Sequence, residues 1–208
     1  MISVIMPCTL QEYEGGAKKR KEKLDRAIKS FLAQDYAEKE LVCVADGCMD
    51  TIQFISDNYN HEPSIRTYYL SKQEHFSGNV RDFGLKRPNG DYIAYLDADD
   101  KLGEPTHLSK IVAGFKSPHA DWIYFDDYVK YFELDHLPLA PREAKLTFGN
   151  IGVSNIAHRN FKDIEWSGCN FYNHDYIFVQ RLIDKYPTYK KIEGTSYVVC
   201  HIQNGCDT

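Results

Sequence analysis

The chain has 208 residues, a formal net charge of −5 and 26% charged residues. This length supports one substantial hydrophobic core, so we expect a single domain over residues 1–208. The acidic balance argues against an extended nucleic-acid surface, which would need a basic field. One basic cluster, residues 18–21 with Lys23, is typical of a solvated loop and helix start; a phosphate or anionic-membrane contact is the alternative.

The first half of the chain alternates apolar strand patterns with helical patterns. Strands are predicted over residues 2–6, 40–45, 65–70 and 91–96, and helices over residues 24–31, 51–59 and 78–86. Continuous apolar strands separated by helices indicate an α/β fold with a mostly parallel, doubly wound central sheet and helices on both faces. This half is Rossmann-like.

The second half has a different pattern, richer in aromatic residues and loops. It predicts helices over residues 108–115 and 175–186, and strands over residues 121–132, 151–158 and 196–200. Two prolines within residues 137–141 predict a loop there. Aromatic side chains at these spacings fit an acceptor-binding surface, although they more often form an ordinary core.

The cysteine pattern and the amino-terminal residues bear on the compartment. The six cysteines form no C-x-x-C pair and no zinc-spaced Cys/His array, which favours reduced thiols. The first residues lack the basic region and long apolar core of a signal peptide, and no stretch is apolar enough to span a bilayer. We therefore expect a cytoplasmic protein without a transmembrane segment.

The most informative segment is residues 90–100, where an apolar strand pattern runs directly into three carboxylates. In open α/β sheets the ligand crevice lies at the carboxyl ends of the strands. Asp97 and Asp99 form the only Asp-x-Asp in the chain. A hard divalent cation such as Mn²⁺ or Mg²⁺ is bound by one or two carboxylates, and substrate phosphates and water complete its shell. The segment therefore predicts a metal-held nucleotide.

Four segments in chain order resemble the signature of family 2 glycosyltransferases, which have the GT-A fold. The segments are ISVIMPCT at residues 2–9, VADGCMD at residues 44–50, GNVRDFG at residues 78–84 and GDYIAYLDADD at residues 90–100. Each follows a predicted strand or opens a predicted helix, and this order carries more weight than any single motif. The resemblance implies a nucleotide-sugar-binding half over residues 1–100 and an acceptor-binding half over residues 101–208. The chain is then a whole enzyme or one domain of a longer one.

The resemblance assigns donor-binding roles to the first half. Pro7 and Thr9 would hold the base and ribose, and Asp46 would accept a hydrogen bond from the base. Arg81 would lie near the base and phosphates, although Asp82 stands where the family commonly has Asn. The alternatives, from the residues alone, are that Asp46 is a turn former beside Gly47 and that Arg81 is a surface arginine on a helix.

The resemblance also assigns roles around the metal and the acceptor. Asp97 would lie near the ribose, Ala98 would contact the substrate, and Asp99 would bind the metal that bridges the two phosphates. His201 matches a histidine near the metal or the diphosphate. Asp175 matches the catalytic base, with His174 where Glu is common; a raised pKa would suit it to accept the proton of the acceptor hydroxyl. Asp at a helix start is also an ordinary N-cap, and Asp100 is a turn residue or a hydrogen-bond partner.

Together these features predict a metal-dependent, inverting glycosyltransferase. Its donor would be a UDP-sugar carrying a hexose or deoxyhexose, such as UDP-glucose or UDP-rhamnose, and its acceptor a glycan or another hydroxyl compound. One alternative is a non-catalytic nucleotide- or carbohydrate-binding module on a degenerate GT-A fold. Another is a sugar nucleotidyltransferase, which would be expected to carry a Gly-rich, basic loop after the first strand, where this chain has PCTLQE.

Overall fold

The computed structural model describes residues 1–12, 18–72, 78–116, 119–130, 138–166 and 174–200. Its first half contains strands β1 (Ile2–Cys8), β2 (Lys39–Asp46), β3 (Ile65–Leu70) and β4 (Tyr92–Tyr95), and helices α1 (Arg20–Leu32), α2 (Met49–Tyr59) and α3 (Gly78–Leu85). These elements occur in the predicted order and near the predicted bounds.

The second half is more broken than its pattern indicates. It contains β5 (Lys101–Leu102), α4 (His107–Lys116), β6 (Trp122–Phe125), β7 (Asp127–Val129), β8 (Ala140–Arg142), the short 3₁₀ helix η2 (Val153–Asn155), β9 (Ile156–Arg159), α5 (His174–Lys185), β10 (Tyr189–Ile192) and β11 (Tyr197–Val199).

The main sheet has seven described strands in the order β10-β6-β9-β4-β1-β2-β3. β1 lies between β2 and β4 and is parallel to both, with Val4 opposite Leu41 and Ala94. β9 is antiparallel to both of its neighbours, β4 and β6. A mostly parallel central sheet with flanking helices is the predicted fold class.

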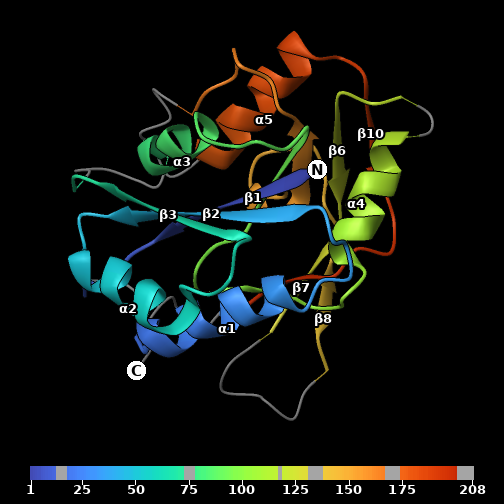
Figure 1. Ribbon diagram of the computed structural model, residues 1–208. Helices are drawn as coiled ribbons and strands as arrows, with labels where there is room; N and C mark the ends of the chain where they lie inside the picture. The colour runs from blue at the N-terminus through green and yellow to red at the C-terminus, as the bar shows by residue number, and fades with distance from the viewer. Residues whose placement is uncertain (13–17, 73–77, 117–118, 131–137, 167–173, 201–208) are drawn as a thin grey trace.

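Alternate residues of β1 pack into two different hydrophobic layers, because successive side chains of a strand point to opposite faces. Val4 packs into a core with α1, α2 and α4, whereas Ile5 packs into a core with α3 and α5. Figure 1 shows α3 and α5 on one side of the sheet and α1 and α2 on the other. Burial of both faces explains why β1 and β2 have continuous apolar sequences.

A second, smaller sheet of order β5-β11-β7-β8 was not predicted. The expected strand over residues 121–132 is wrong as one element, since β6 belongs to the main sheet and β7 to the small one. Part of the loop expected at 137–141 is also wrong, because Ala140 and Pro141 form β8 at an edge, where proline costs no ladder hydrogen bond. The strand expected over 151–158 begins only at Ile156, after the 3₁₀ helix.

Two smaller expectations concern the membrane and the thiols. Within the part of the chain that the structure describes, no helix has both the length and the apolar composition of a membrane span. Cys8, Cys43, Cys48 and Cys200 are free cysteines, as expected for reduced thiols, while the remaining two lie outside the described residues.

Candidate active site

Three acidic residues follow β4 and enter a cavity at the carboxyl edge of the main sheet. Leu96 N donates to Ile5 O at 3.1 Å, and Asp100 N donates to Asp97 O at 3.0 Å, so the chain turns as soon as the strand ends. The cavity measures about 310 Å³, and its lining includes Asp97, Asp99, Asp100, Arg142, Gly152 and Asp175. The edge of the sheet thus collects carboxylates from both halves of the chain.

Arg81 of α3 connects the predicted donor side to the predicted base. Its Nη2 donates to Asp97 Oδ1 at 2.7 Å, and its Nη1 lies 3.9 Å from Asp175 Oδ1 and 3.3 Å from His174 Nε2. The side chain is only 3% exposed, so Arg81 is not a surface arginine. Burial lowers the pKa of Arg81, but the charges of Asp97 and Asp175 outweigh it and the pKa is raised, which keeps the guanidinium charged.

Trp166 packs against Arg81, and Asp82 binds the backbone of Trp166. The guanidinium carbon lies 5.0 Å from the centre of a Trp166 ring, a cation–π contact. The backbone N–H of Trp166 donates to the Asp82 carboxylate, so Asp82 links α3 to the later segment. Sequence analysis missed Trp166, because nothing in its neighbourhood connects it with α3.

Asp97 carries a raised pKa in this crowded environment. Burial is the largest cause; Arg81 acts against it, and the charges of Asp99 and Asp175 add to it. Negative charges held close together repel, and a bound cation would relieve that repulsion. Asp97 and Asp99 are therefore suited to a divalent metal.

Asp97 and Asp99 could supply the one or two carboxylate ligands that such a metal takes from a protein. Hard cations take oxygen ligands, and in nucleotide sites the substrate phosphates supply several of them. Among the residues that the structure describes, no group of three His, Cys, Asp or Glu side chains forms a ready cage. His201, the predicted further metal residue, lies outside the described residues.

Asp100 is a hydrogen-bond partner that fastens the strand end to β11. Tyr197 Oη donates to Asp100 Oδ2 at 2.9 Å and accepts from Asp97 N at 3.0 Å, and Cys200 N donates to Asp100 Oδ1 at 2.8 Å. Burial, with the charges of Asp99 and Asp97, raises the pKa of Asp100 well above its usual value. Both oxygens of Asp100 are thus used within the protein.

Asp175 lies in the first turn of α5 and faces the same cavity. Val153 N donates to its Oδ2 at 3.1 Å, and His174 Nε2 lies 3.1 Å from its Oδ1. The expected raised pKa is wrong: burial acts to raise the pKa of Asp175, but His174, Arg81 and the Val153 N–H outweigh it and lower the pKa. Asp175 is ionised at neutral pH.

The remaining predicted donor residues occupy the same edge of the sheet. Pro7 pairs with Val44 in the β1–β2 ladder, and Thr9 O accepts from Arg20 Nη1 at 3.2 Å. Asp46 ends β2 and accepts from Lys72 Nζ at 2.8 Å. Ala98 is half-buried and packs against the core.

Gly47, directly after Asp46, accounts for the turn at the end of β2. Its φ is +65°, and a Cβ there would lie 2.5 Å from Lys72 Cβ, so only glycine fits. Gly47 alone therefore makes the turn possible. The Asp46 carboxylate is not needed for the turn and binds Lys72 instead.

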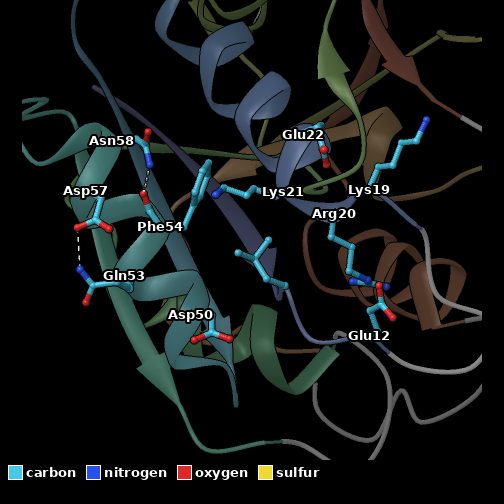
Figure 2. A pocket seen from close by; sticks show the side chains of 11 residues that line it. Glu12, Lys19, Arg20, Lys21, Glu22, Asp50, Gln53, Phe54, Asp57 and Asn58 are labelled. Atoms are coloured by element: carbon cyan, nitrogen blue, oxygen red, sulfur yellow. Dashed lines mark hydrogen bonds between the residues drawn. The ribbon is translucent and has the colours of Figure 1, made fainter.

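A larger cavity of about 520 Å³ lies between α1 and α2 and contains none of the predicted catalytic residues. Figure 2 shows Lys19, Arg20 and Lys21 on one side and Asp50, Gln53 and Asp57 on the other. Lys21 Nζ lies 5.3 Å from the Phe54 ring centre. The basic cluster is solvated as expected at Lys18, Lys19 and Lys21, but Lys23 is buried. Asp97, Asp99 and Asp175 line only the smaller of these two cavities, which favours it as the active site.

Solved structures share this fold. S. aureus TarS 1–349 in complex with UDP superposes with a TM-score of 0.71 and 17% identity, covering 96% of this chain and 60% of that one. The mannosyltransferase PcManGT from Pyrobaculum calidifontis, in complex with GDP-Man and Mn²⁺, gives a TM-score of 0.66 and 15% identity, covering 98% and 58%. These matches confirm the predicted GT-A fold.

Proteins related in sequence match this chain over shorter stretches. The cholesterol galactosyltransferase of Borreliella burgdorferi is 28% identical over 129 residues, 62% of this chain and 34% of that protein. An uncharacterized glycosyltransferase of Haemophilus influenzae is 30% identical over 101 residues, 48% of this chain and 36% of that protein. The chain spans about a third of the length of these curated relatives. The model of the family described as "Glycosyl transferase family 2" matches residues 3–188, and the chain belongs to that family.

Proposed function

We propose that this domain transfers a hexose or deoxyhexose from a UDP-sugar to a hydroxyl group of a glycan or another acceptor, with inversion at the anomeric carbon. One observation carries the proposal: Asp97, Asp99 and Asp175 line the same cavity, and Arg81 contacts both Asp97 and Asp175. Donor and base residues that lie far apart in the sequence therefore face one space. Neighbours of the same fold were solved with UDP and with UDP-GlcNAc, which supports a uridine donor.

In this mechanism Asp175 accepts the proton of the acceptor hydroxyl. The hydroxyl oxygen bonds to the anomeric carbon, the bond from that carbon to the diphosphate breaks, and the electron pair leaves with the nucleoside diphosphate. Because the pKa of Asp175 is lowered, the carboxylate is a weak base toward a free hydroxyl. The proton therefore moves as the new C–O bond forms, when the hydroxyl becomes acidic. Val153 N and His174 hold the carboxylate in position meanwhile.

Asp99, with Asp97, would hold Mn²⁺ or Mg²⁺ in this site. The bound ion would stabilise the charge of the departing diphosphate as a Lewis acid. Pro7, Thr9 and Asp46 would bind the base and ribose, since they lie at the same carboxyl edge of the parallel strands. The proposed compartment is the cytoplasm, where the free thiols remain reduced.

The test separates catalysis from simple binding. Asp175→Asn keeps the size of the side chain but cannot accept the proton, so transfer should fall ~10²–10⁴-fold while binding of UDP-sugar stays unchanged. The unfolding temperature should fall, because the ionised carboxylate interacts with Arg81 and His174, and a cooperative unfolding transition checks that the variant is folded. UDP release with a panel of acceptor sugars measures transfer, and NMR gives the anomeric configuration of the product. Asp184→Asn, an exposed change later on α5, is the matched control.

Three outcomes would count against the proposal. Undiminished transfer in Asp175→Asn would remove that residue from the mechanism, and a product that keeps the donor's configuration would overturn inversion. Nucleotide binding without any transfer by the wild-type protein would favour the non-catalytic module instead. Family membership already argues against the sugar nucleotidyltransferase.

A further inference from the structure

The segment before η2 exposes a large aromatic side chain close to the active-site cavity. Phe148 is 60% exposed. Its neighbours Thr147, Gly149 and Asn150 are also exposed and are polar or small, so the ring is an isolated apolar surface. A lipid tail or a protein partner would require a broad contiguous apolar patch. A single ring within polar surroundings suits a ligand of similar size with a polar rim.

Hydrogen bonds within the segment hold Phe148 in this exposed position. Lys145 N donates to Asn150 O at 2.9 Å, and Asn150 N donates to Thr147 O at 3.1 Å, which closes a tight loop around the phenylalanine. Asn150 Nδ2 donates to Thr147 Oγ1 at 3.1 Å. Gly149 has φ +77°, a conformation that other residues rarely adopt. Exposure of the ring is thus fixed by the backbone.

The same segment also contacts the proposed base. Phe148 packs edge-on against Tyr176, with ring centres 6.0 Å apart and an angle of 73°, and Tyr176 directly follows Asp175. A Cβ at Gly152 would lie 3.3 Å from Asp175 Oδ2, and Val153 N donates to that oxygen. Gly149 and Gly152 both line the active-site cavity. The exposed ring and the base are therefore positioned by one short piece of chain.

We propose that Phe148, supported by Tyr176, binds a sugar ring of the acceptor through one C–H face, so that the acceptor is a carbohydrate. This inference rests on the proposed function, because it places the acceptor hydroxyl at Asp175. The face of an aromatic ring is negative, and the C–H hydrogens on one side of a pyranose are weakly positive and apolar, so the two surfaces attract. The hydroxyls at the edge of the sugar stay free to face water or Asp175.

The donor base does not compete for this surface in the proposed arrangement. The base would lie by Asp46 at the end of β2, whereas Phe148 belongs to the segment leading into β9, with β4 and β1 between them in the sheet. Substitution of Phe148 should therefore separate acceptor effects from donor effects.

The experiment compares Phe148→Ala, Phe148→Leu and Phe148→Tyr with the wild-type protein. Phe148→Ala and Phe148→Leu should raise KM for the acceptor sugar about tenfold, because a stacked aromatic contact contributes on that scale. Phe148→Tyr keeps the aromatic face and should retain the wild-type KM. UDP-sugar binding and its slow hydrolysis without acceptor should not change in any variant. Tyr69→Ala, which removes another exposed aromatic ring, on β3, is the matched control.

Saturation-transfer NMR gives a second measurement that does not need turnover. Methyl glycosides added to the UDP-saturated protein should receive saturation mainly on the C–H hydrogens of one ring face, and Phe148→Ala should abolish the effect. A wild-type KM in Phe148→Ala, no saturation transfer to any glycoside, or transfer only to a long-chain alcohol would overturn the inference. If the proposed function itself is wrong, the wild-type protein would neither bind nor hydrolyse UDP-sugars. If only this inference is wrong, UDP-sugar binding and hydrolysis would remain and the saturation transfer to glycosides would be missing.

Discussion

Arg81 donates a 2.7 Å hydrogen bond from Nη2 to Oδ1 of Asp97, although its own side chain is only 3% exposed. A buried arginine needs compensation for lost hydration, and here two carboxylates and an aromatic ring provide it. The interaction joins α3 to the end of β4 and, through Asp175, to α5. Arg81 thereby sets the spacing between the proposed donor and acceptor sides.

Arg81→Met should change both stability and the pH dependence of transfer. Removing the cation leaves two carboxylates facing each other and should lower the free energy of unfolding by about 2 kcal/mol. Breaking a fully buried ion pair costs about 3–5 kcal/mol. We expect less here because Asp97 and Asp175 are 31% and 28% exposed. Arg81 helps to lower the pKa of Asp175, so its loss should move the acid limb of the kcat/KM profile to higher pH. Lys86→Met, an exposed basic residue beside α3, is the control. An unmoved acid limb would show that Asp175 is not the group being titrated.

Asp99→Ala should abolish metal-dependent binding of the nucleotide sugar and leave the fold intact, because the side chain is exposed and contributes no core packing. Titration calorimetry of UDP with and without Mn²⁺ measures the effect, and the unfolding temperature checks the fold. Asp184→Ala removes an exposed carboxylate elsewhere and should bind as wild type does. Wild-type affinity for UDP with Mn²⁺ in Asp99→Ala would place the metal site elsewhere.

Asp46→Ala should weaken the binding of uridine nucleotides by ~1–3 kcal/mol, the scale of a buried polar group left unpaired. Pyrophosphate, which lacks a base, should bind as before. Lys72→Ala breaks the same 2.8 Å ion pair while keeping the carboxylate, so it separates ligand recognition from local structure. An equal loss for UDP and pyrophosphate in Asp46→Ala would make Asp46 a purely structural residue.

His158 should make the protein less stable in mild acid. It is fully buried, and burial lowers its pKa from 6.5 to about 4. Between these values the unfolded chain binds a proton that the folded protein does not, so the free energy of unfolding falls as pH decreases through this window, by up to about 1.4 kcal/mol per pH unit. His158→Gln should remove that slope.

Chemical denaturation of wild type and His158→Gln at several pH values measures the difference. Comparison of the two slopes isolates His158, because Asp97 and Asp100 contribute to both. The exposed His61→Gln is the control and should keep the wild-type slope. Equal slopes in wild type and His158→Gln would mean that the imidazole gains protons in the folded state as readily as in the unfolded chain.

Sequence patterns predict the buried elements well and the edge strands poorly. The middle residues of β1 and β2, Val4–Met6 and Leu41–Ala45, are all apolar because both faces are covered, so their pattern is unambiguous. β10, of sequence YKKI, was missed because it pairs on one side only, with β6, and carries polar side chains. The tyrosine-rich segment breaks just before Asp127, the buried first residue of β7, which is bound by Arg142 and Ser154. No local sequence pattern indicates those partners.

The same distinction holds within the site. Asp97 and Asp99 could be predicted because they come directly after a strand, and ligands of open α/β sheets bind at the carboxyl ends of the strands. The contact between Arg81 and Asp97, the bonds from Tyr197 to the strand end and the lowered pKa of Asp175 all depend on residues from distant segments. Local periodicity carries no information about such pairs.

The reversed direction of β9 has a consequence for how the protein acquires its activity. Because β9 runs opposite to β4 and β6, its starting end reaches the same edge at which β4 finishes, and it brings the Val153 N–H to Asp175 there. Arg81 and His174, which also meet in this site, are 93 residues apart in the sequence, and contacts of such long separation form slowly. During synthesis the strands of the first half emerge before α5, which carries the proposed base. A chain interrupted before α5 would lack that base and also Tyr197, whose hydroxyl fixes the carboxyl end of β4.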